Sequence, residues 1–556
     1  MGKYAIGVDY GTLSVRSLLV DINTGEEVAS SVYEYPHGVM EERIPSGAAL
    51  APGWALQDPQ DYLDGLIATV KSVVSQKEIF PEEVVGIGVD FTSSTVMSVK
   101  SDMTPMCQLE EFKNEPHAYV KLWKHHGAEQ EAQFIDQVIK ERGEKWIDLY
   151  GGKVSSEWMI PKVLETLRNA PEVYKQADGM MEALDWVIWK MTGVETRSAC
   201  GAGYKAFYRH DTGYPTREFF RALDPAMENF VEEKMNAPVK SIGETAGYLC
   251  PSMAERMGLL EGTPVGTGII DAHASLPGCG IGKTGEMMII VGTSSCHMML
   301  SEIEAGIEGV GGLVKDGIMP GYFGYEAGQC CVGDHFAWFV DNCVPESYWL
   351  EARDKGISVH QLLTQKLEGY KAGQSGLVAL DWFNGVRSPL MDFNLNGLIM
   401  GMNLLTKPEE IYLALIEATA YGTRMIIESF EKAGVKVDSV VLSGGIPVKN
   451  SMLVQVYSDI CKRSIRVSAS TQASALGAAI LGIAAAGEEV TGYKNASDIA
   501  RKIGKLHEKV YTPNPENAAV YDRLYMEYVT LHEYFGKGAN DVMKRLNRIR
   551  EEQREK

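Results

Sequence analysis

"GVDYGTLSVRSLLVD" (residues 7–21) brings a short apolar run to Asp9, turns at once through Gly11 and Thr12, and returns as a second apolar run. Together with "EVASSVYEY" (27–35), this stretch predicts an antiparallel β-meander over residues 4–35. An acid at the end of an apolar strand costs desolvation free energy unless a partner compensates it. The small turn beside Asp9 indicates that this partner is a cation bridging to a phosphate.

A second strand of the same kind follows a predicted helix. The helix covers 58–76, with Asp58 before Pro59 as its N-cap, and leads into "VVGIGVDFTSST" (84–95). In α/β sheets, ligands gather at the carboxyl ends of strands, where Asp9 and Asp90 are both expected. For Asp90, chance convergence of buried strands on Ile, Gly and Val is an equally supported interpretation.

The chain is long enough for two large domains with a cleft between them. Its 556 residues exceed what one hydrophobic core usually organises. The glycine-rich "GCGIGKTGE" (278–286) predicts the boundary, which gives an N-terminal domain of residues 1–282 and a C-terminal domain of residues 283–556.

Charge and composition restrict the class of ligand. Acidic residues outnumber basic ones 74 to 53, for a net charge of −21, so we expect neither nucleic acid nor a membrane as partner. An anionic ligand would need backbone N–H groups, helix N-termini and a divalent ion. The nine scattered cysteines and an N-terminus without a signal-peptide pattern predict a cytoplasmic protein with reduced thiols. A homo-oligomer is compatible with the sequence.

The second half of the chain repeats the strand-and-turn pattern of the first. "TPVGTGIIDAHAS" (263–275) predicts a strand ending at Asp271, and "GEMMIIVGTSSCHMML" (285–300) predicts a hairpin with a small-residue turn. A long helix is expected at 408–434, then a strand and Gly-Gly turn in "VVLSGGIPVKN" (440–450). "QASALGAAILGIAAAG" (472–487) predicts a helix of small residues that packs very close to a neighbour.

These motifs, in this order, resemble those of the FGGY family of carbohydrate kinases, within the actin, Hsp70 and sugar kinase superfamily. No Walker lysine motif, GxSxG, HExxH or protein-kinase loop set competes with this interpretation. The resemblance covers essentially the whole chain. It implies an α/β, two-domain actin-like (ribonuclease H-like) fold with mixed sheets flanked by helices, a catalytic cleft between the domains, and ATP and Mg²⁺ as cofactors.

The resemblance implies a role for each motif. Asp271 matches the general base that accepts the proton of the sugar hydroxyl, and Asp9, with Asp271, matches the metal-side acids. The implied ATP contacts are Gly11, Thr12, Gly292, Thr293, Ser294, Gly444, Gly445 and Asn450. Taken singly, the glycine pairs are equally typical of ordinary turns, and Asp271 is equally typical of a helix cap.

For the sugar, the resemblance implies Ser93, Ser94, Trp123, Lys205, Glu326 and again Asp271. "LWKHHGA" (122–128), "GAGYKAF" (201–207) and "FGYEAGQ" (323–329) resemble members that phosphorylate a ketopentose, L-ribulose in particular. Each contact has a plainer alternative: a core tryptophan, a solvated lysine or a turn glutamate. The pair His125-His126 is expected at the surface, without a metal.

Two positions depart from the family pattern. Glu165 stands in "PKVLE" (161–165) where many members carry Trp, which points away from the glycerol and xylulose branches, and Leu415 stands where a smaller or β-branched residue is usual. Two alternatives therefore stay open: a kinase for another substrate (xylulose, glycerol or a sugar acid), and an actin-like ATPase that phosphorylates no sugar.

Overall fold

The computed structural model describes residues 2–77 and 79–554. The chain forms two compact units. The first unit holds the described part of residues 1–283 together with 312–324 and 472–505, and the second holds 284–311, 325–471 and 506–554. Among the described residues no single helix is long and apolar enough to cross a membrane, although one sharply bent pair, 473–485 with 488–503, passes by length and composition.

A seven-stranded mixed sheet forms the centre of the first unit. Its order is β11 (Thr245–Tyr248), β12 (Pro264–Gly266), β5 (Val84–Phe91), β1 (Tyr4–Tyr10), β2 (Ser14–Asp21) and β3 (Glu27–Glu34), and β13 (Ile269–Ile270) also pairs with β5. The strands β1, β2 and β3 are antiparallel, which confirms the predicted meander, and β5 runs parallel to β1.

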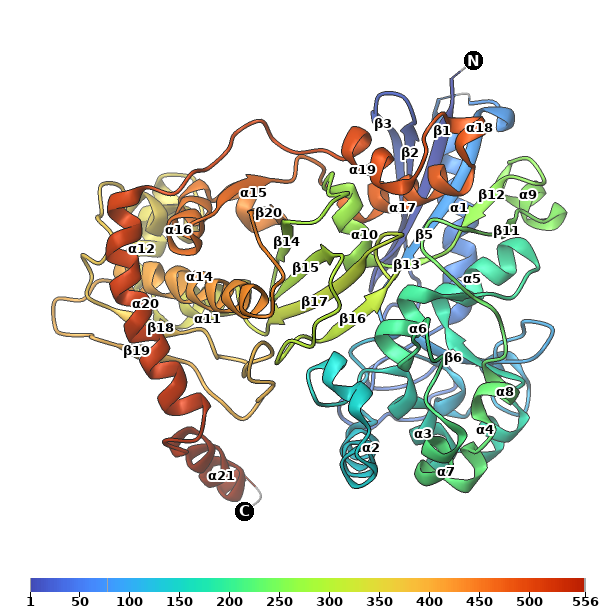
Figure 1. Cartoon of the computed structure of the whole chain (residues 1–556), viewed down its shortest axis with the longest axis horizontal. Helices are drawn as coiled ribbons and strands as arrows, with labels where there is room; N and C mark the ends of the chain where they lie inside the picture. The colour runs from blue at the N-terminus through green and yellow to red at the C-terminus, as the bar shows by residue number, and fades with distance from the viewer. Residues whose placement is uncertain (1, 78, 555–556) are drawn as a thin grey trace. The chain divides into compact units, whose positions relative to one another are not determined.

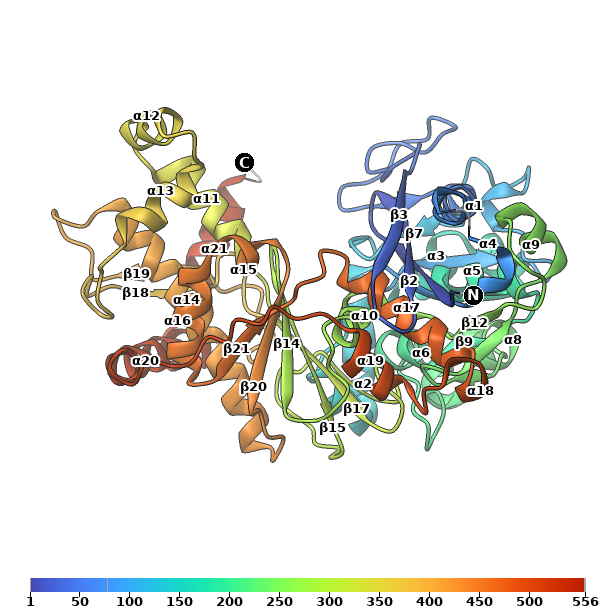
Figure 2. The ribbon, with the colours of Figure 1, turned by 90° about the horizontal axis from the view of Figure 1, so that it is seen from above.

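Two helices cover the sheet of the first unit on opposite faces. Helix α1 (Pro59–Gln76), capped by Asp58 as predicted, packs its apolar side on Ile6, Val8 and the other large side chains of one face. Helix α17 (Ala473–Ala485) packs on the other face against β1 and β5, from which it is separated by hundreds of residues (Figures 1 and 2). Because side chains alternate along a strand, Gly7, Gly86 and Gly88 all lie on this second face.

A four-stranded sheet organises the rest of the first unit. Its order is β4 (Leu56–Gln57), β7 (Val120–Lys121), β6 (Val96–Val99) and β8 (Gly179–Glu182). Its helices include α3 (Met159–Asn169), α5 (Ala183–Thr192) and α6 (Ala199–Ala206), and α10 (Asp271–Gly278) follows β13. The remaining elements are α2 (Glu129–Arg142), α4 (Pro171–Gln176), α7 (Arg217–Leu223), α8 (Phe230–Lys234), α9 (Pro251–Met257), α18 (Glu488–Thr491), α19 (Ala496–Ile503), β9 (Arg197–Ser198), β10 (Val239–Lys240) and β16 (Gly312–Lys315).

The second unit repeats the hairpin and parallel strand of the first. Its strands follow the order β17 (Phe323–Gln329), β15 (Ser295–Ser301), β14 (Glu286–Val291), β20 (Ser439–Ser443) and β21 (Ser464–Val467). The β14–β15 pair is antiparallel and β20 is parallel to β14, as β5 is to β1. The other elements are α11 (Gly333–Cys343), α12 (Glu346–Asp354), α13 (Val359–Lys366), β18 (Val378–Leu380), β19 (Leu398–Met400), α14 (Pro408–Lys432), α15 (Gly445–Lys449), α16 (Ser451–Cys461), α20 (Pro515–Gly536) and α21 (Val542–Arg554).

The sequence predicts one domain boundary, between residues 282 and 283, whereas the chain passes between the two units several times. The chain first passes from one unit to the other at Lys283, but residues 312–324 and 472–505 belong to the first unit. The physical reason is the close packing of α17 on β1 and β5, which a continuous C-terminal domain of residues 283–556 would not allow.

Candidate active site

Three acids lie at one edge of the sheet in the first unit. Asp9 and Asp90 are direct neighbours across the parallel pair β1–β5. On the other side of β5, β13 pairs in parallel with it and places Ile269 opposite Asp90. Asp271 comes two residues after Ile269, directly after the end of β13. All three acids therefore lie at the carboxyl ends of neighbouring strands, where α/β proteins bind ligands. Asp90, which sequence reasoning left undecided, belongs to this group.

The electrostatics of this edge favour a cation. Asp90 is completely buried, and the polar side chain beside its carboxyl group is that of Asp9. Burial and the neighbouring Asp9 raise the pKa of Asp90 well above its usual value, and burial also raises the pKa of Asp9. Arg16, 3.8 Å from Asp9, is a partial counter-charge.

These acids fit a magnesium ion that is completed by a substrate. Within the described chain, no group of three His, Cys, Asp or Glu side chains could hold a metal ion by itself. Mg²⁺ usually touches one or two carboxylates and keeps waters or substrate phosphates as its other ligands. Asp9 and Asp271, on either side of Asp90 at this edge, suit such a partial site.

The turn after β1 lies beside the predicted sugar residue Trp123. The Gly11 amide donates to the carbonyl of Ser14 at 2.9 Å, which closes the hairpin. The Thr12 hydroxyl accepts a hydrogen bond from the Trp123 indole at 3.1 Å. Trp123 is 38% exposed, so it is not simply a core residue. The structure thus brings a predicted phosphate contact and a predicted sugar contact together.

The other sugar residues come from three elements. Ser93 and Ser94 form the turn directly after β5, with their hydroxyls 3.3 Å apart. Lys205 lies on α6 and is only 5% exposed, so the alternative of a solvated lysine is wrong. Glu326 lies within β17 of the second unit rather than in a turn.

A buried contact links the helices that carry Lys205 and Asp271. The Sγ of Cys200 on α6 lies 3.3 Å from Nδ1 of His273 on α10, and the ring of Tyr204 stacks on His273 with centroids 4.3 Å apart. This cluster fixes α6 against α10. It therefore holds the predicted base and one predicted sugar contact in a set relation.

In the second unit, two glycine-rich turns meet at the ends of β14 and β20. The Gly292 amide donates to the Ser294 carbonyl at 2.9 Å and closes a turn one residue shorter than the one that Gly11 closes in the first unit. The Val332 amide donates to the Thr293 carbonyl at 2.8 Å, just before α11. Gly444 has a φ of 101°, and a Cβ there would lie 2.4 Å from the carbonyl oxygen of Val291.

Gly445 borders open space, whereas the side chain of Asn450 is engaged in capping a helix. A Cβ on Gly445 would meet nothing within 4 Å, so this position borders open space at the start of α15. Asn450 is the N-cap of α16: its Oδ1 accepts from the Leu453 amide at 3.0 Å, and its Nδ2 lies 3.5 Å from the Thr364 hydroxyl. The side-chain oxygen of Asn450 thus has a structural role that the sequence did not reveal.

Sequence reasoning missed a buried charged network in the first unit. His125, expected at the surface, is completely buried, and its Nε2 lies 3.0 Å from Glu165. Lys121 donates to Glu165 at 2.6 Å, and Lys162 is also buried. The one sequence feature that could have indicated this network is Glu165, which stands where many members of the resembled family carry a tryptophan.

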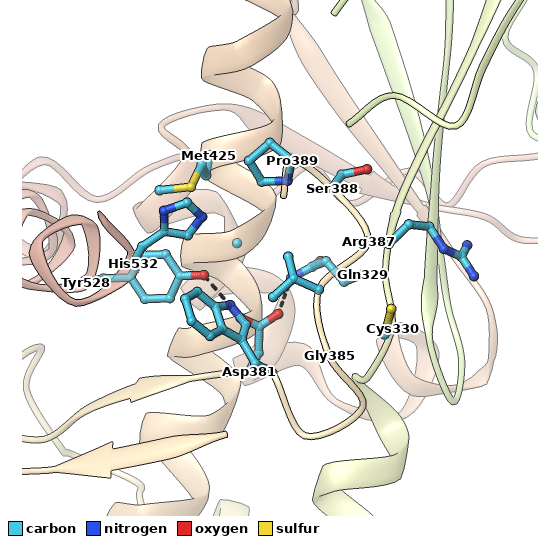
Figure 3. Close-up of a pocket in the computed structure, with 13 residues that line it drawn as sticks. Gln329, Cys330, Asp381, Gly385, Arg387, Ser388, Pro389, Met425, Tyr528 and His532 are labelled. Carbon is cyan, nitrogen blue, oxygen red and sulfur yellow. Dashed lines mark hydrogen bonds between the residues drawn. The ribbon is translucent and has the colours of Figure 1, made fainter. Parts of the chain in front are cut away.

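A small, partly open cavity in the second unit has no room for a sugar or a nucleotide. It measures about 10 Å³, the space of roughly one water molecule. Asp381 lies in its wall and accepts from the Gln329 amide at 2.8 Å and the Tyr528 hydroxyl at 3.1 Å (Figure 3). This network ties α20 to β17 and is structural.

The comparisons with known proteins identify the family of the chain. Residues 4–278 match the N-terminal domain, and residues 287–486 the C-terminal domain, of the FGGY family of carbohydrate kinases. Proteins named Ribulokinase from Geobacillus thermodenitrificans and Anoxybacillus flavithermus are each 50% identical over 551 residues, covering 99% of this chain and 97% of theirs.

A solved structure agrees with the fold as well. The xylulose kinase from Rhodospirillum rubrum matches with a TM-score of 0.79 at 19% identity, over 95% of this chain and 98% of that one. The fold is therefore the two-domain α/β fold of the sugar kinases, with mixed sheets flanked by helices. Because both family domains match in order and half-identical relatives extend over nearly the whole sequence, the chain belongs to the FGGY family of carbohydrate kinases.

Proposed function

We propose that this protein transfers the γ-phosphoryl group of ATP to L-ribulose, a step in the catabolism of L-arabinose, and forms L-ribulose 5-phosphate and ADP. Proteins of its family phosphorylate sugars with ATP. The half-identical, full-length relatives named Ribulokinase support L-ribulose over xylulose, glycerol or a sugar acid. The nine scattered cysteines, with no CxxC pair among them, support a reducing, cytoplasmic setting.

Asp271 is the general base of this proposal. Its carboxylate accepts the proton of the sugar hydroxyl while that oxygen attacks the γ-phosphorus and the bond to ADP breaks. The observation that carries the proposal is the edge where Asp271 meets Asp9 and Asp90. Asp271 begins α10, and the positive end of a helix stabilises the ionised carboxylate that a base requires.

Asp9 is the proposed ligand of Mg²⁺, directly or through water, with Asp271 as the second metal-side acid. When bound, the ion neutralises phosphate charge and orients the γ-phosphate. The proposed phosphate contacts are Gly11, Thr12, Gly292, Thr293 and Ser294, and the proposed adenosine contacts are Gly444, Gly445 and the amide nitrogen of Asn450. The Gly11 and Gly292 amides close their own turns, so the phosphates would meet the close glycine backbone and the hydroxyls of Thr12, Thr293 and Ser294.

The sugar contacts of this proposal are Ser93, Ser94, Trp123, Lys205 and Glu326. The buried ammonium of Lys205 suits a fixed hydroxyl partner, because a lysine so placed has few conformations to lose on binding. The half-exposed ring of Trp123 offers an apolar wall to one face of the sugar.

The decisive experiment measures ADP release by Asp271→Asn with L-ribulose as acceptor. Loss of a general base typically lowers kcat by about 10²–10⁴-fold, and we expect nucleotide affinity to stay within about twofold. An Asp271→Asn enzyme within tenfold of wild type would overturn the role of Asp271. A panel of D- and L-ribulose, D-xylulose, glycerol and gluconate tests the substrate separately: turnover of xylulose or glycerol with neither ribulose would remove L-ribulose as the substrate.

A further inference from the structure

Helix α3 holds two backbone segments through one completely buried lysine. The Nζ of Lys162 donates to the carbonyl of Ser94 at 2.7 Å and to the carbonyl of Leu122 at 2.7 Å. A buried ammonium is costly unless its protons are used, and here two of them bind backbone oxygens. Lys162 thus joins the turn after β5 to the segment after β7.

Both segments carry proposed sugar contacts. Ser94 has a φ of 53°, a left-handed conformation that is uncommon for a residue other than glycine and needs support from its surroundings. Leu122 is followed by Trp123, whose indole reaches the Thr12 hydroxyl. A single side chain therefore sets the distance between Ser93-Ser94 and Trp123.

The next turn of α3 fixes the same segment a second time. Glu165 accepts from Lys121 at 2.6 Å and lies 3.0 Å from Nε2 of His125, so it holds both sides of Trp123. Lys121 also donates to the Thr166 hydroxyl at 2.7 Å, and the Ala55 amide donates to Nδ1 of His125 at 3.3 Å. Residues 162, 165 and 166 share one face of the helix, as their spacing requires.

We propose that Lys162 and Glu165 are positioning residues for the sugar subsite. They touch no substrate; they fix the turn at Ser93-Ser94 relative to the ring of Trp123. Apolar side chains of similar volume could fill this interior without fixing two carbonyls at set positions, and such use of buried charge for geometric specificity is known in other proteins. The inference rests on the proposed function, because it takes these segments to line the sugar subsite.

The test is Lys162→Met, with Lys234→Met as its matched control. Lys234 is also a buried lysine of the first unit that donates to a backbone carbonyl, that of Ala177, but it holds no proposed sugar segment. We expect the KM for L-ribulose to rise at least tenfold in Lys162→Met, with the KM for ATP within twofold. Lys234→Met should leave both values near wild type. Hydrogen exchange should increase in peptides covering 91–97 and 120–127 in Lys162→Met alone.

Glu165→Gln is the milder second variant, because its amide keeps the size of the side chain and a hydrogen bond to Lys121. It decides the question if Lys162→Met does not fold: the sugar KM should rise more than the ATP KM. An unchanged sugar KM in the folded variants, or equal losses in Lys162→Met and Lys234→Met, would overturn the proposal. If wild type prefers another polyol, the same comparison uses that acceptor, and the exchange measurement needs no activity. A failure of the substrate assignment is thus distinguishable from a failure of the positioning role.

Discussion

Replacing Gly477 by alanine should move the proposed base without touching it. Gly477 lies where α17 crosses α10, and a Cβ there would stand 1.7 Å from the carbonyl oxygen of Ala274, three residues after Asp271. The contact is reciprocal, since a Cβ on Gly278 would stand 1.9 Å from the carbonyl oxygen of Ala473. Both obstacles are backbone atoms, so no side-chain rotation relieves them.

The size of the effect follows from that distance. Real Cβ atoms do not approach other atoms closer than about 3.0 Å, so α10 must shift by about 1.3 Å relative to α17. A misplacement of about 1 Å at a reacting group lowers the rate by about 100-fold, which is the fall in kcat that we expect. Overpacking costs about 1–3 kcal/mol, and the better helix propensity of alanine returns about 1 kcal/mol. The free energy of unfolding should therefore fall by no more than about 2 kcal/mol.

The assay is steady-state ADP release, with thermal unfolding of the same preparations. Gly65→Ala is the control, because Gly65 is also buried in a helix of the first unit, but its Cβ would meet the Val15 side chain at 2.3 Å rather than backbone. We expect Gly65→Ala to lose some stability and keep its kcat. A Gly477→Ala enzyme with wild-type kcat would refute the claim that the α17–α10 contact sets the position of Asp271.

Three further predictions follow from single sites. Gly444→Ala should raise the KM for ATP at least tenfold with little change in the sugar KM, because φ is 101° there and the Cβ would stand 2.4 Å from the Val291 carbonyl oxygen; isothermal titration with ATP checks this, and unchanged affinity would contradict it. Glu165→Ala should lower the free energy of unfolding by about 3–5 kcal/mol in urea titration, because it leaves the buried Lys121 unpaired, while a loss below about 1 kcal/mol would show that the pair is unimportant. Burial lowers the pKa of His125 to about 4, below its unfolded value of about 6.5. Its contribution to the free energy of unfolding is therefore complete above pH 6.5 and falls by about 3 kcal/mol as the pH drops to 4. A Tm that stays flat over this range would contradict the argument.

The local elements of the fold could be predicted from the sequence because their signals are local. Strand alternation, the Gly-Thr turn and the Asp58-Pro59 cap each act within a few residues, and all three are confirmed. The close-packing helix at 472–487 was predicted from its small residues alone, and α17 is confirmed as such a helix. Its partner was not predictable, because nothing in residues 472–505 states that they return to β1 and β5.

Candidate site residues could be predicted where one short motif identifies them. They could not be predicted where their role depends on contacts with residues far away in the sequence. Asp9 and Asp90 follow two apolar runs of the same pattern, so their common edge was expected, whereas Asp271 was joined to Asp9 only through the family resemblance. Lys162 and Glu165 look like ordinary charged residues of an amphipathic helix, and their burial depends on Lys121, His125 and two carbonyls about 40 to 70 residues away.

The glycines and acids of β1 and β5 form one pattern with two consequences. Gly7 precedes Asp9 by two residues and Gly88 precedes Asp90 by two, so each pair lies on the same face of its strand. The glycines let the backbone of α17 approach closely: a Cβ on Gly86 would meet Gly482, and one on Gly88 would meet Ala478.

The contacts of β5 with α17 step backward along the helix as the strand advances, so the helix runs antiparallel to β5 and its N-terminus lies toward Asp90. The positive ends of α17 and α10 are therefore both directed at the edge that holds Asp9, Asp90 and Asp271. The positive ends of these two helices offset part of the negative charge of the three acids. A divalent cation would neutralise the rest. The glycines that allow close packing are thus a condition for gathering the acids. A methyl group added at the α17–α10 contact should therefore lower kcat as well as stability.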